Sequence, residues 1–213
     1  MKKKLVITIG REFCSGGSDI GKQIAAHFGI PYYDKEIIDA TAEVLKCSPS
    51  VVEQYDEKPV RLWGLYGYQY GTSLYAGDPS LILPPGIKIA AAQFHAVAKF
   101  AESSSCVIVG RCADYLLKDK PDVIKIFVRA DTDSRVKRVM RLYKLNEKDA
   151  KKLIKKTDKV RIDYYGIHTQ QKWGDAKNYD LLINTAAIGI SGAAEVIIKY
   201  IELKDIYNKT VSD

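Results

Sequence analysis

The stretch LVITIGREFCSGGSDIGK, residues 5–22, decides the fold. It begins with the apolar run 5–9, continues through a loop that contains Gly16 and Gly17, and then enters a helical pattern. In α/β sheets, ligands bind where the carboxyl end of a strand meets the following helix. Glycines there let backbone N–H groups approach phosphate oxygens, and the helix dipole adds partial positive charge. The stretch therefore predicts an anion-binding loop after the first strand.

One alignment of this loop follows the spacing of a phosphate-binding P-loop, G-x-x-x-x-G-K, literally. Gly16, Gly21 and Lys22 satisfy that spacing, but Gln23 stands where a Ser or Thr should bind Mg²⁺. The match also begins seven residues after Ile9, which is late for a loop that directly follows a strand. This alignment is the weaker of two, although the sequence leaves it open.

The second alignment, which we prefer, takes residues 11–17 as the loop and makes Ser18 the Mg²⁺-binding hydroxyl at the helix start. Gly17 then stands at the position of the usual lysine. Lys22 lies one turn after Ser18 on the same helix face, and helical side chains lean toward the N-terminus. We expect Lys22 or Arg11 to supply the missing cation. A tight turn that binds no ligand is the alternative.

Short β-branched or aromatic runs alternate with helical patterns along the whole chain. Strands are expected over residues 5–9, 30–33, 106–109, 123–128 and 180–183. Helices are expected over residues 19–28, 35–46, 50–57, 88–103, 131–145, 147–159 and 191–203. Continuous apolar strands separated by helices predict an α/β fold with a parallel sheet covered on both faces.

Length and composition exclude several classes of protein. The 213 residues are 46% hydrophobic and 28% charged, which is a globular profile and not a collagen-like, coiled-coil or disordered one. No apolar run approaches the ~20 residues that span a bilayer. The basic start is followed by only five apolar residues, too few for a signal peptide, so we expect a cytoplasmic protein. The four cysteines form no CxxC pair, which fits reduced thiols.

The positive charge of the chain is concentrated in one segment. Between Arg135 and Arg161 there are twelve Lys and Arg and three Asp and Glu, a local charge of +9 against +7 for the whole chain. A phosphate-rich ligand or a polyanion is therefore expected at this part of the surface. Proteins that bind single-stranded nucleic acid intersperse aromatic residues among the basic ones. Only Tyr143 lies in this segment, which argues against nucleic acid as the partner.

Five stretches are read together with the Arg-rich segment: ITIGREFCSGGSDIGKQIA (7–25), FGIPYYDKEII (28–38), CVIVGRCADYLL (106–117), IKIFVRA (124–130) and QQKWGDAKNYDLLIN (170–184). Together they resemble the cytidylate kinase-like family of P-loop nucleoside monophosphate kinases, over roughly residues 4–203. The resemblance implies a three-layer P-loop kinase fold with a five-stranded parallel core and a helical lid. It also implies transfer of a phosphoryl group from ATP, with Mg²⁺, to CMP or dCMP.

The chain is expected to form a single P-loop kinase-like domain over residues 1–204, followed by a tail, 205–213. The core is assigned to 1–58, 88–130 and 175–204, the lid to 131–174, and an acceptor-binding insertion to 59–87. Trp, Tyr, Gly and Pro are frequent in the insertion, which excludes a central strand or a regular helix. Its aromatic residues 63–75 are expected to stack on a pyrimidine or to form a contact between two copies of the chain.

Charged residues after the second and third predicted strands are candidates for acceptor binding. Arg111 resembles the family arginine that holds the monophosphate, and a salt-bridged arginine at the sheet rim is the alternative. Asp114 is expected to pair with Arg111 or to contact the base. Asp34 and Lys35 open a helix. Asp34 either caps that helix, positions the acceptor, or contacts Mg²⁺ through water.

Phosphoryl transfer needs positioning and positive charge more than covalent chemistry, and arginine binds phosphate oxygens in pairs. The resemblance assigns Arg161 to a lid arginine that touches both phosphates. The predicted catalytic residues are Arg11, Lys22, Arg138 and Arg161. The residues predicted to bind ATP are Ser15, Gly16, Gly17, Ser18, Gly21 and Arg135, with Ser18 also binding Mg²⁺.

Two other functions remain open at this stage. The first is a P-loop phosphotransferase for a nucleoside, a shikimate-like metabolite or a coenzyme precursor, since residues 60–86 lack the usual short helices that bind a monophosphate. The second is a non-catalytic nucleotide-binding protein, which the missing lysine favours. Assays of ADP release with different acceptors separate these possibilities.

Overall fold

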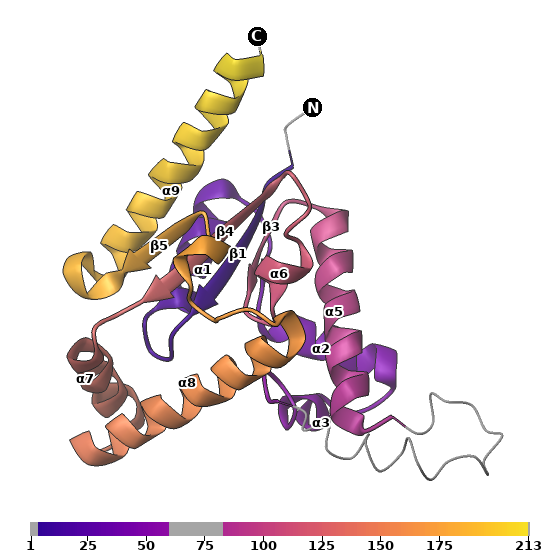
Figure 1. The fold of residues 1–213 in the computed structure, drawn as a ribbon, viewed down its shortest axis with the longest axis vertical. Helices are drawn as coiled ribbons and strands as arrows, with labels where there is room; N and C mark the ends of the chain where they lie inside the picture. Colours follow the sequence, from indigo (N-terminus) through magenta and orange to yellow (C-terminus); the bar gives the residue numbers. More distant parts are fainter. Residues whose placement is uncertain (1–3, 60–82, 213) are drawn as a thin grey trace, which may run out of the picture.

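The computed structural model describes residues 4–59 and 83–212, with side chains as far as Asp205. A parallel β-sheet lies at the centre, with helices on both faces (Figure 1). Within the described residues its strands are β1 (Val6–Arg11), β2 (Tyr32–Tyr33), β3 (Cys106–Val109), β4 (Val123–Arg129) and β5 (Leu181–Asn184). Their order is β2-β3-β1-β4-β5, and every neighbouring pair is parallel. The predicted α/β class with a five-stranded parallel sheet is confirmed.

The helices follow the strands in the alternation that the sequence predicts. They are α1 (Gly17–Phe28), α2 (Lys35–Leu45), α3 (Pro49–Glu53), α5 (Pro85–Ser103), α6 (Ala113–Leu116), α7 (Thr132–Tyr143), α8 (Glu147–Thr169) and α9 (Thr185–Ser212), with a 3₁₀ turn at Ala176–Asn178. Among the described residues, no helix is both long and apolar enough to cross a membrane.

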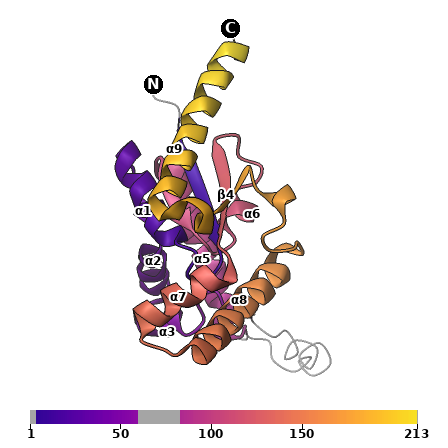
Figure 2. The same cartoon turned by 90° about the vertical axis from the view of Figure 1, so that its left-hand side faces the viewer.

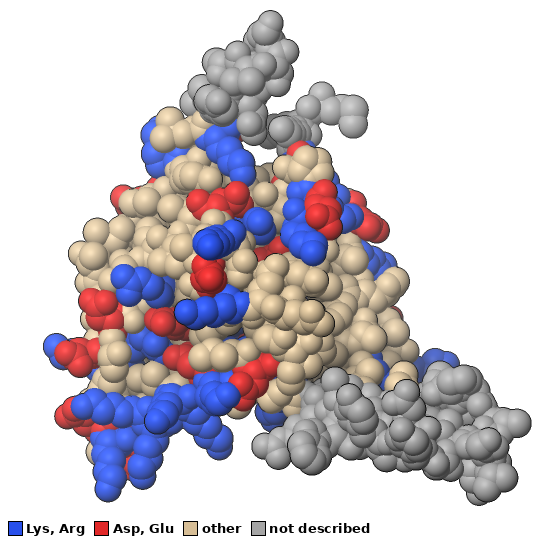
Figure 3. Space-filling model, in the orientation of Figure 1, with Lys and Arg blue, Asp and Glu red and all other residues tan. Residues whose placement is uncertain are grey.

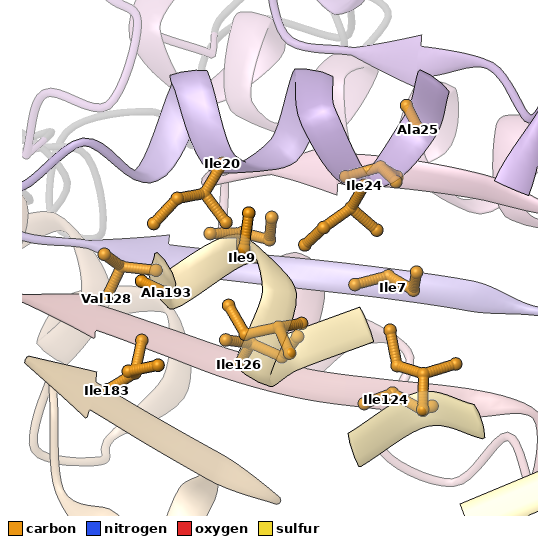
Figure 4. Close-up of a cluster of buried hydrophobic side chains, with 14 of the residues drawn as sticks. Ile7, Ile9, Ile20, Ile24, Ala25, Ile124, Ile126, Val128, Ile183 and Ala193 are labelled. Atoms are coloured by element: carbon orange, nitrogen blue, oxygen red, sulfur yellow. The ribbon is translucent and has the colours of Figure 1, made fainter. Parts of the chain in front are cut away.

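One face of the sheet is covered by α1 and α9. Ile7 and Ile9 of β1 pack there against Ile20 and Ile24 of α1 (Figure 4). Ile197 of α9 belongs to the same cluster. These five isoleucines are at most 1% exposed, and complete burial of such a side chain contributes about 1.5–3 kcal/mol. The apolar residues of α1 and α9 therefore face the sheet and hold both helices on this side of it.

The other face of the sheet is covered by α2, α5 and α6. Val6 and Ile108 of the strands pack there with Ile37 of α2, Val97 of α5 and Ala113 of α6. Burial on both faces explains why the strands are continuously apolar instead of alternating. The helix, sheet and helix layers confirm the three-layer fold.

β1 is the central strand, since β3 pairs with it on one side and β4 on the other. All strands run in the same direction, so their carboxyl ends meet at one edge. Helices α7 and α8 lie beyond that edge in both views (Figures 1 and 2). The fold therefore brings the loop after β1 close to the most basic part of the chain.

Several predicted helix boundaries were wrong. The helix expected over 147–159 continues to Thr169, because Tyr164 and Tyr165 provide a buried face beyond its lysine-rich part. The helix expected over 191–203 is part of α9, which begins at Thr185 and is interrupted at Gly189, where φ is 73° and ψ is 176°. The helix expected over 50–57 ends at Glu53.

Most of the predicted acceptor-binding insertion lies outside the described residues. This applies to residues 60–82, and so to the whole aromatic segment 63–75 and its expected contacts. Residues 85–87, also assigned to the insertion, belong to the first turn of α5. The assignment of core, lid, insertion and tail stays a prediction.

Candidate active site

The loop between β1 and α1 is held against the carboxyl ends of the neighbouring strands. Ser15 Oγ donates a hydrogen bond to the carbonyl of Val128, at 2.9 Å, and Thr185 Oγ1 donates to the carbonyl of Ser15, at 2.8 Å. Gly16 adopts a left-handed conformation with φ of 94° directly before the helix. A Cβ at position 16 would lie 2.8 Å from Cγ1 of Ile190, so both its conformation and its close contact require glycine.

The start of α1 offers backbone donors. Gly16 precedes the helix without a side-chain cap. Within the described part of the chain, the N–H groups of Gly17 and Ser18 have no hydrogen-bond partner. Free amides at a helix N-terminus and the helix dipole together favour an anion. The loop thus has the backbone geometry of a phosphate-binding turn.

The structure also distinguishes the two alignments of the P-loop. The literal G-x-x-x-x-G-K match needs residues 16–21 to form the loop, but α1 already begins at Gly17, so that alignment is wrong. Gly21 lies inside the helix, where a Cβ would be 2.9 Å from the Tyr32 ring and 3.2 Å from Ile9. Gly21 therefore permits close packing of α1 on the sheet and is not brought to the loop.

Arg111 follows β3 and is almost completely enclosed by hydrogen-bond acceptors. Its side chain is 2% exposed. It forms a bidentate pair with Asp56, at 2.9 and 3.0 Å, while its Nη1 contacts Asp34 Oδ1 at 2.9 Å and the carbonyl of Val109 at 3.1 Å. Burial opposes the charged form, but the neighbouring carboxylates outweigh it and raise the pKa of Arg111. The guanidinium is a buried and permanently charged centre.

Glu57 accepts hydrogen bonds from three directions. Its Oε1 accepts from Arg11 Nη1 at 2.6 Å and from the backbone N–H of Arg111 at 3.0 Å, and its Oε2 accepts from Arg161 Nε at 3.2 Å. Burial opposes ionisation of Glu57, but the charges of Arg11 and Arg161 outweigh it and hold its pKa well below the ordinary value. A carboxylate therefore sits where donors from β1, the turn after β3 and α8 converge.

The arginines of α7 and α8 are also tied to the loop after β1. Arg135 is 5% exposed, donates to the carbonyl of Phe13 at 2.8 Å, and pairs with Asp158 and Glu12. The N–H of Phe13 donates to Asp158 Oδ1 at 2.8 Å. Arg135 thus holds the loop and α8 together, and its predicted contact with ATP would require these bonds to change.

Arg138 and Arg161, predicted as catalytic, are brought to opposite ends of the same loop. Arg138 pairs with the half-exposed Asp19 in the first turn of α1. Arg161 donates from Nη1 to the carbonyl of Arg11 at 3.1 Å. Figure 3 shows the wider basic surface over α7 and α8, at the lower left. Its exposed lysines include Lys151, Lys152, Lys155 and Lys156.

A cavity of about 360 Å³ adjoins the loop on the side of α7 and α9. Lys137, Arg138 and Arg141 line one side, and Ala186 and Ile190 line the other. Cys14, Ser15, Ala130, Ser134, Thr185 and Gly189 complete it. A cavity with an apolar wall, a cationic wall and an anion-binding turn at its end has the chemistry to hold a nucleotide.

Ser18 and Asp34 lie together on the opposite side of the helix start. Ser18 Oγ and the Tyr32 hydroxyl donate to Asp34 Oδ2, at 3.4 and 3.1 Å. Burial raises the pKa of Asp34, but Arg11 and Arg111 outweigh burial and lower it, so the carboxylate is ionised. A hydroxyl beside an ionised carboxylate fits Mg²⁺, which takes few protein ligands and keeps water and phosphate oxygens. No group of three or more His, Cys, Asp or Glu suited to a metal occurs in the described residues.

Three other predicted site residues have different surroundings. Lys22 is exposed, and its Nζ lies 5.8 Å from the centre of the Tyr32 ring. Lys35 is exposed at the start of α2. Asp114 does not pair with Arg111. It is buried and accepts from Tyr165 at 2.7 Å, and burial raises its pKa.

The sequence interpretation missed Asp56 and Glu57. Both lie at the end of the helix expected over residues 50–57, whereas that helix stops at Glu53 and the chain turns toward the sheet. Glu57 has a φ of 49°, a conformation that no local pattern around it indicates. The one available signal was indirect, since several arginines at one sheet edge require carboxylates to balance their charge.

Comparison with known proteins connects this arrangement to other chains. An uncharacterized protein from Eubacterium ventriosum ATCC 27560 has 33% identity and a TM-score of 0.70, over 93% of this chain and 99% of that one. Shikimate kinase from Bacteroides thetaiotaomicron has 13% identity and a TM-score of 0.56, over 94% and 99%. Shikimate kinase from Acinetobacter baumannii, in complex with shikimate, has 11% identity and a TM-score of 0.51, over 98% and 96%.

The shikimate kinase structures share the fold and confirm that it is that of P-loop kinases. No protein with a curated description matches the sequence significantly. The model of the cytidylate kinase-like family matches residues 6–187, which include the loop after β1, the turn after β3 and the arginines of α7 and α8. The resemblance inferred from the motifs is thereby confirmed, and this chain belongs to the cytidylate kinase-like family.

Proposed function

We propose that the protein is an ATP-dependent phosphotransferase whose acceptor is CMP or dCMP. The observation that carries this proposal is the junction of three features at one sheet edge: the free amides of α1, the adjoining cavity, and the guanidinium groups around Glu57. Membership of the family and the P-loop kinase fold support a kinase-like phosphotransferase.

In this proposal the cavity between α7 and α9 takes the nucleoside of ATP. Ile190 and Ala186 supply apolar contact, while Arg138 and Arg141 lie on the cationic side. The phosphate chain then passes over the amides of Gly17 and Ser18 toward the sheet edge, because Cys14 and Ser15 of the loop before these amides line the cavity. This path directs the terminal phosphoryl group to the side where Asp34 and Arg111 lie.

Ser18 and Asp34 are the residues that would hold Mg²⁺. The ion, when bound, supplies charge neutralisation to the phosphate oxygens. The chain itself contributes fixed positive charge from Arg11 and Arg161, which requires no reorganisation during transfer. Arg138 of α7 pairs with Asp19 in the first turn of α1, and it contacts the phosphate chain once it exchanges this partner.

A second acceptor class is favoured by the state of Arg111. The resemblance makes Arg111 the holder of the acceptor monophosphate, yet its Nε, Nη1 and Nη2 are all engaged by Asp34, Asp56 and the Val109 carbonyl. A small hydroxylated acceptor without a phosphate group needs no free guanidinium. In this alternative, the same donor site serves an acceptor oriented by the carboxylate of Asp34.

An assay of ADP release with Mg²⁺-ATP tests both alternatives. The acceptors are CMP, dCMP, UMP, AMP, GMP and TMP, each compared with its nucleoside, together with shikimate as a non-nucleotide acceptor. Turnover with CMP or dCMP above the rate with water supports the first acceptor class, and turnover with phosphate-free acceptors supports the second. A folded sample that releases no ADP with any acceptor contradicts the proposed enzyme.

A further inference from the structure

Arg11 occupies the space in which the side chain of an orthodox P-loop lysine would begin. It is the last residue of β1, and a Cβ at Gly17, the lysine position, would lie 2.5 Å from the Cβ and 2.9 Å from the Cγ of Arg11. Farther out, a Cβ at Gly110 would overlap Nη1 of Arg11. The Arg11 side chain therefore passes over two glycines, from Gly17 at the lysine position to Gly110 in the turn after β3.

This path brings the Arg11 guanidinium to a place where two other donors converge. Arg161 Nε and the backbone N–H of Arg111 come from α8 and from the turn after β3. All three donate to one anion, the carboxylate of Glu57, whose side chain is 13% exposed. Three donors from separate elements therefore surround one largely buried anion, which is the arrangement of a preorganised anion site. A surface ion pair would be exposed to solvent and would have fewer donors.

Glu57 is held in this site in a strained conformation. Its φ of 49° lies in the left-handed region, which residues other than glycine rarely adopt. Such strain persists only where surrounding contacts over-determine the conformation, and it is concentrated at functional sites. Here the contacts that hold it are the three hydrogen bonds to its carboxylate.

Charge balance sets the condition for a ligand to enter. Arg11, Arg111 and Arg161 face the carboxylates of Asp34, Asp56 and Glu57. A phosphoryl group added to this cluster would bring uncompensated negative charge into a buried region, which is strongly unfavourable. An anion that replaces Glu57 instead recovers the same donors. Of the three carboxylates, only Glu57 is bound by Arg11, the arginine that crosses Gly17.

We propose that the three donors around the Glu57 carboxylate form a binding site for a phosphoryl group, which displaces that carboxylate when it binds. The inference rests on the proposed function for the identity of the ligand, and it names the site of the transferred group. Two sources supply the same chemistry, namely the terminal phosphoryl of ATP and the phosphate of a nucleoside monophosphate. Glu57 is accordingly an internal competitor, and the apparent affinity for the ligand is reduced by the fraction of time that Glu57 fills the site.

Calorimetric titration of the full chain with ATP, ADP, CMP, cytidine and inorganic phosphate tests this site. Glu57→Gln removes the competing charge at constant shape, and Glu57→Asp keeps the charge but shortens the reach. The matched control is Glu102→Gln, which makes the same charge change at an exposed carboxylate paired with Lys120. Thermal unfolding without ligand shows that each variant is folded.

Glu57→Gln is expected to bind inorganic phosphate at least about tenfold more tightly than the wild type, with Glu57→Asp between the two and Glu102→Gln unchanged. If the gain appears for ATP but not ADP, the terminal phosphoryl is the occupant; if it appears for CMP but not cytidine, the acceptor phosphate is. Unchanged or weaker phosphate binding in both folded Glu57 variants overturns the site.

This outcome is independent of the proposed enzyme activity. Tighter phosphate binding by Glu57→Gln together with no ADP release from the wild type would retain the anion site and remove the kinase assignment. Conversely, ADP release from the wild type together with equal phosphate binding in all variants would retain the kinase and remove Glu57 as the competitor. Each experiment therefore decides its own proposal.

Discussion

Arg11 ends β1 and Arg111 follows β3, at the same edge of the sheet, yet the two arginines are neutralised to different degrees. Arg111 contacts two carboxylates and a carbonyl, and its side chain is 2% exposed. Among the described residues, Arg11 contacts a single carboxylate, that of Glu57, and its side chain is 10% exposed. We infer that Arg111, which has more fixed acceptors, maintains the fold. Arg11, which has fewer, is the arginine that exchanges its partner for a ligand.

The same distinction applies to α7 and α8. Arg135 is saturated by Asp158, Glu12 and the Phe13 carbonyl, so it fixes the loop after β1. In the part of the chain that the structure describes, Arg161 has one carboxylate and one carbonyl as acceptors, and it shares that carboxylate with Arg11. We therefore expect saturated arginines to control stability and singly paired ones to control ligand binding.

The largest effect is expected for Arg111→Met. Removal of one member of a buried ion pair leaves uncompensated charge, here on Asp34 and Asp56, and costs about 3–5 kcal/mol of the free energy of unfolding. Urea unfolding followed by circular dichroism measures this loss. Arg129→Met, at an exposed arginine with a partner 3.9 Å away, is the control and should change little. A stability loss in Arg111→Met no greater than in the control would contradict the comparison.

The opposite pattern is expected for Arg11→Met. Glu57 retains Arg161 and the Arg111 N–H, so the loss of stability should be about 1–2 kcal/mol. The loss of fixed positive charge at the reacting group should lower kcat about 10²–10³-fold. Steady-state ADP release and urea unfolding of the same sample separate these effects. An active Arg11→Met enzyme would show that its guanidinium does not replace the lysine.

Gly17→Ala sharpens the claim that Arg11 fills the lysine space. The new Cβ would lie 2.5 Å from the Cβ of Arg11, and overpacking of this kind costs about 1–3 kcal/mol. The double variant with Arg11→Gly, which removes that side chain, should recover most of this loss. A double-mutant cycle of unfolding free energies measures the coupling, and additive losses would show that the two positions do not compete for space.

How much of this could be predicted from the sequence depended on whether the determinant was local. The strand and loop at residues 5–18 were found because apolar runs and glycines act on their own neighbours in the chain. The sheet, its parallel strands and the loop alignment with Ser18 at the helix start follow from such patterns. The length of α8 was missed because Tyr164 and Tyr165 are buried by other elements, not by a local period.

The ion-pair cluster could be predicted only in part. Arg11, Asp34 and Arg111 were identified because each follows a strand at the edge where ligands bind. Their mutual pairing, and the entry of Glu57 from a segment after α3, depend on contacts between residues 46 to 77 positions apart. Neither composition nor spacing records such contacts, so the sequence indicated the arginines and Asp34 but not Asp56 and Glu57, which complete the neutralisation.

Acid unfolding is expected to report on Glu57. Its pKa is lower in the folded protein than the ordinary 4.5, because the charges of Arg11 and Arg161 outweigh the effect of burial. Ionised Glu57 therefore stabilises the fold above about pH 4.5, and this contribution is lost as the pH falls. Glu57→Gln should show a shallower loss of stability between about pH 5 and pH 2. Urea unfolding at each pH, with the exposed Glu53→Gln as control, measures the slopes, and parallel wild-type and Glu57→Gln slopes would contradict this.

The smallest effect is expected for Lys22→Met. Lys22 is exposed and its Nζ lies near the Tyr32 ring, so its loss should change stability within about 0.5 kcal/mol. If Arg11 supplies the cation, kcat should change by less than about threefold, a difference of roughly 0.7 kcal/mol in the barrier. Comparison with Arg11→Met in the same assay decides between the two cations, and a hundredfold loss in Lys22→Met would reverse the assignment.

The most direct test of the central claim is a crystal structure of the wild-type protein with Mg²⁺, a non-hydrolysable ATP analogue and CMP. We predict phosphate oxygens of the analogue on the N–H groups of Gly17 and Ser18. We also predict a phosphoryl group, either the terminal one of the analogue or that of CMP, on Arg11 and Arg161 in place of the Glu57 carboxylate. Bound ligands that leave Glu57 paired with both arginines, or an analogue that lies away from the start of α1, would contradict this.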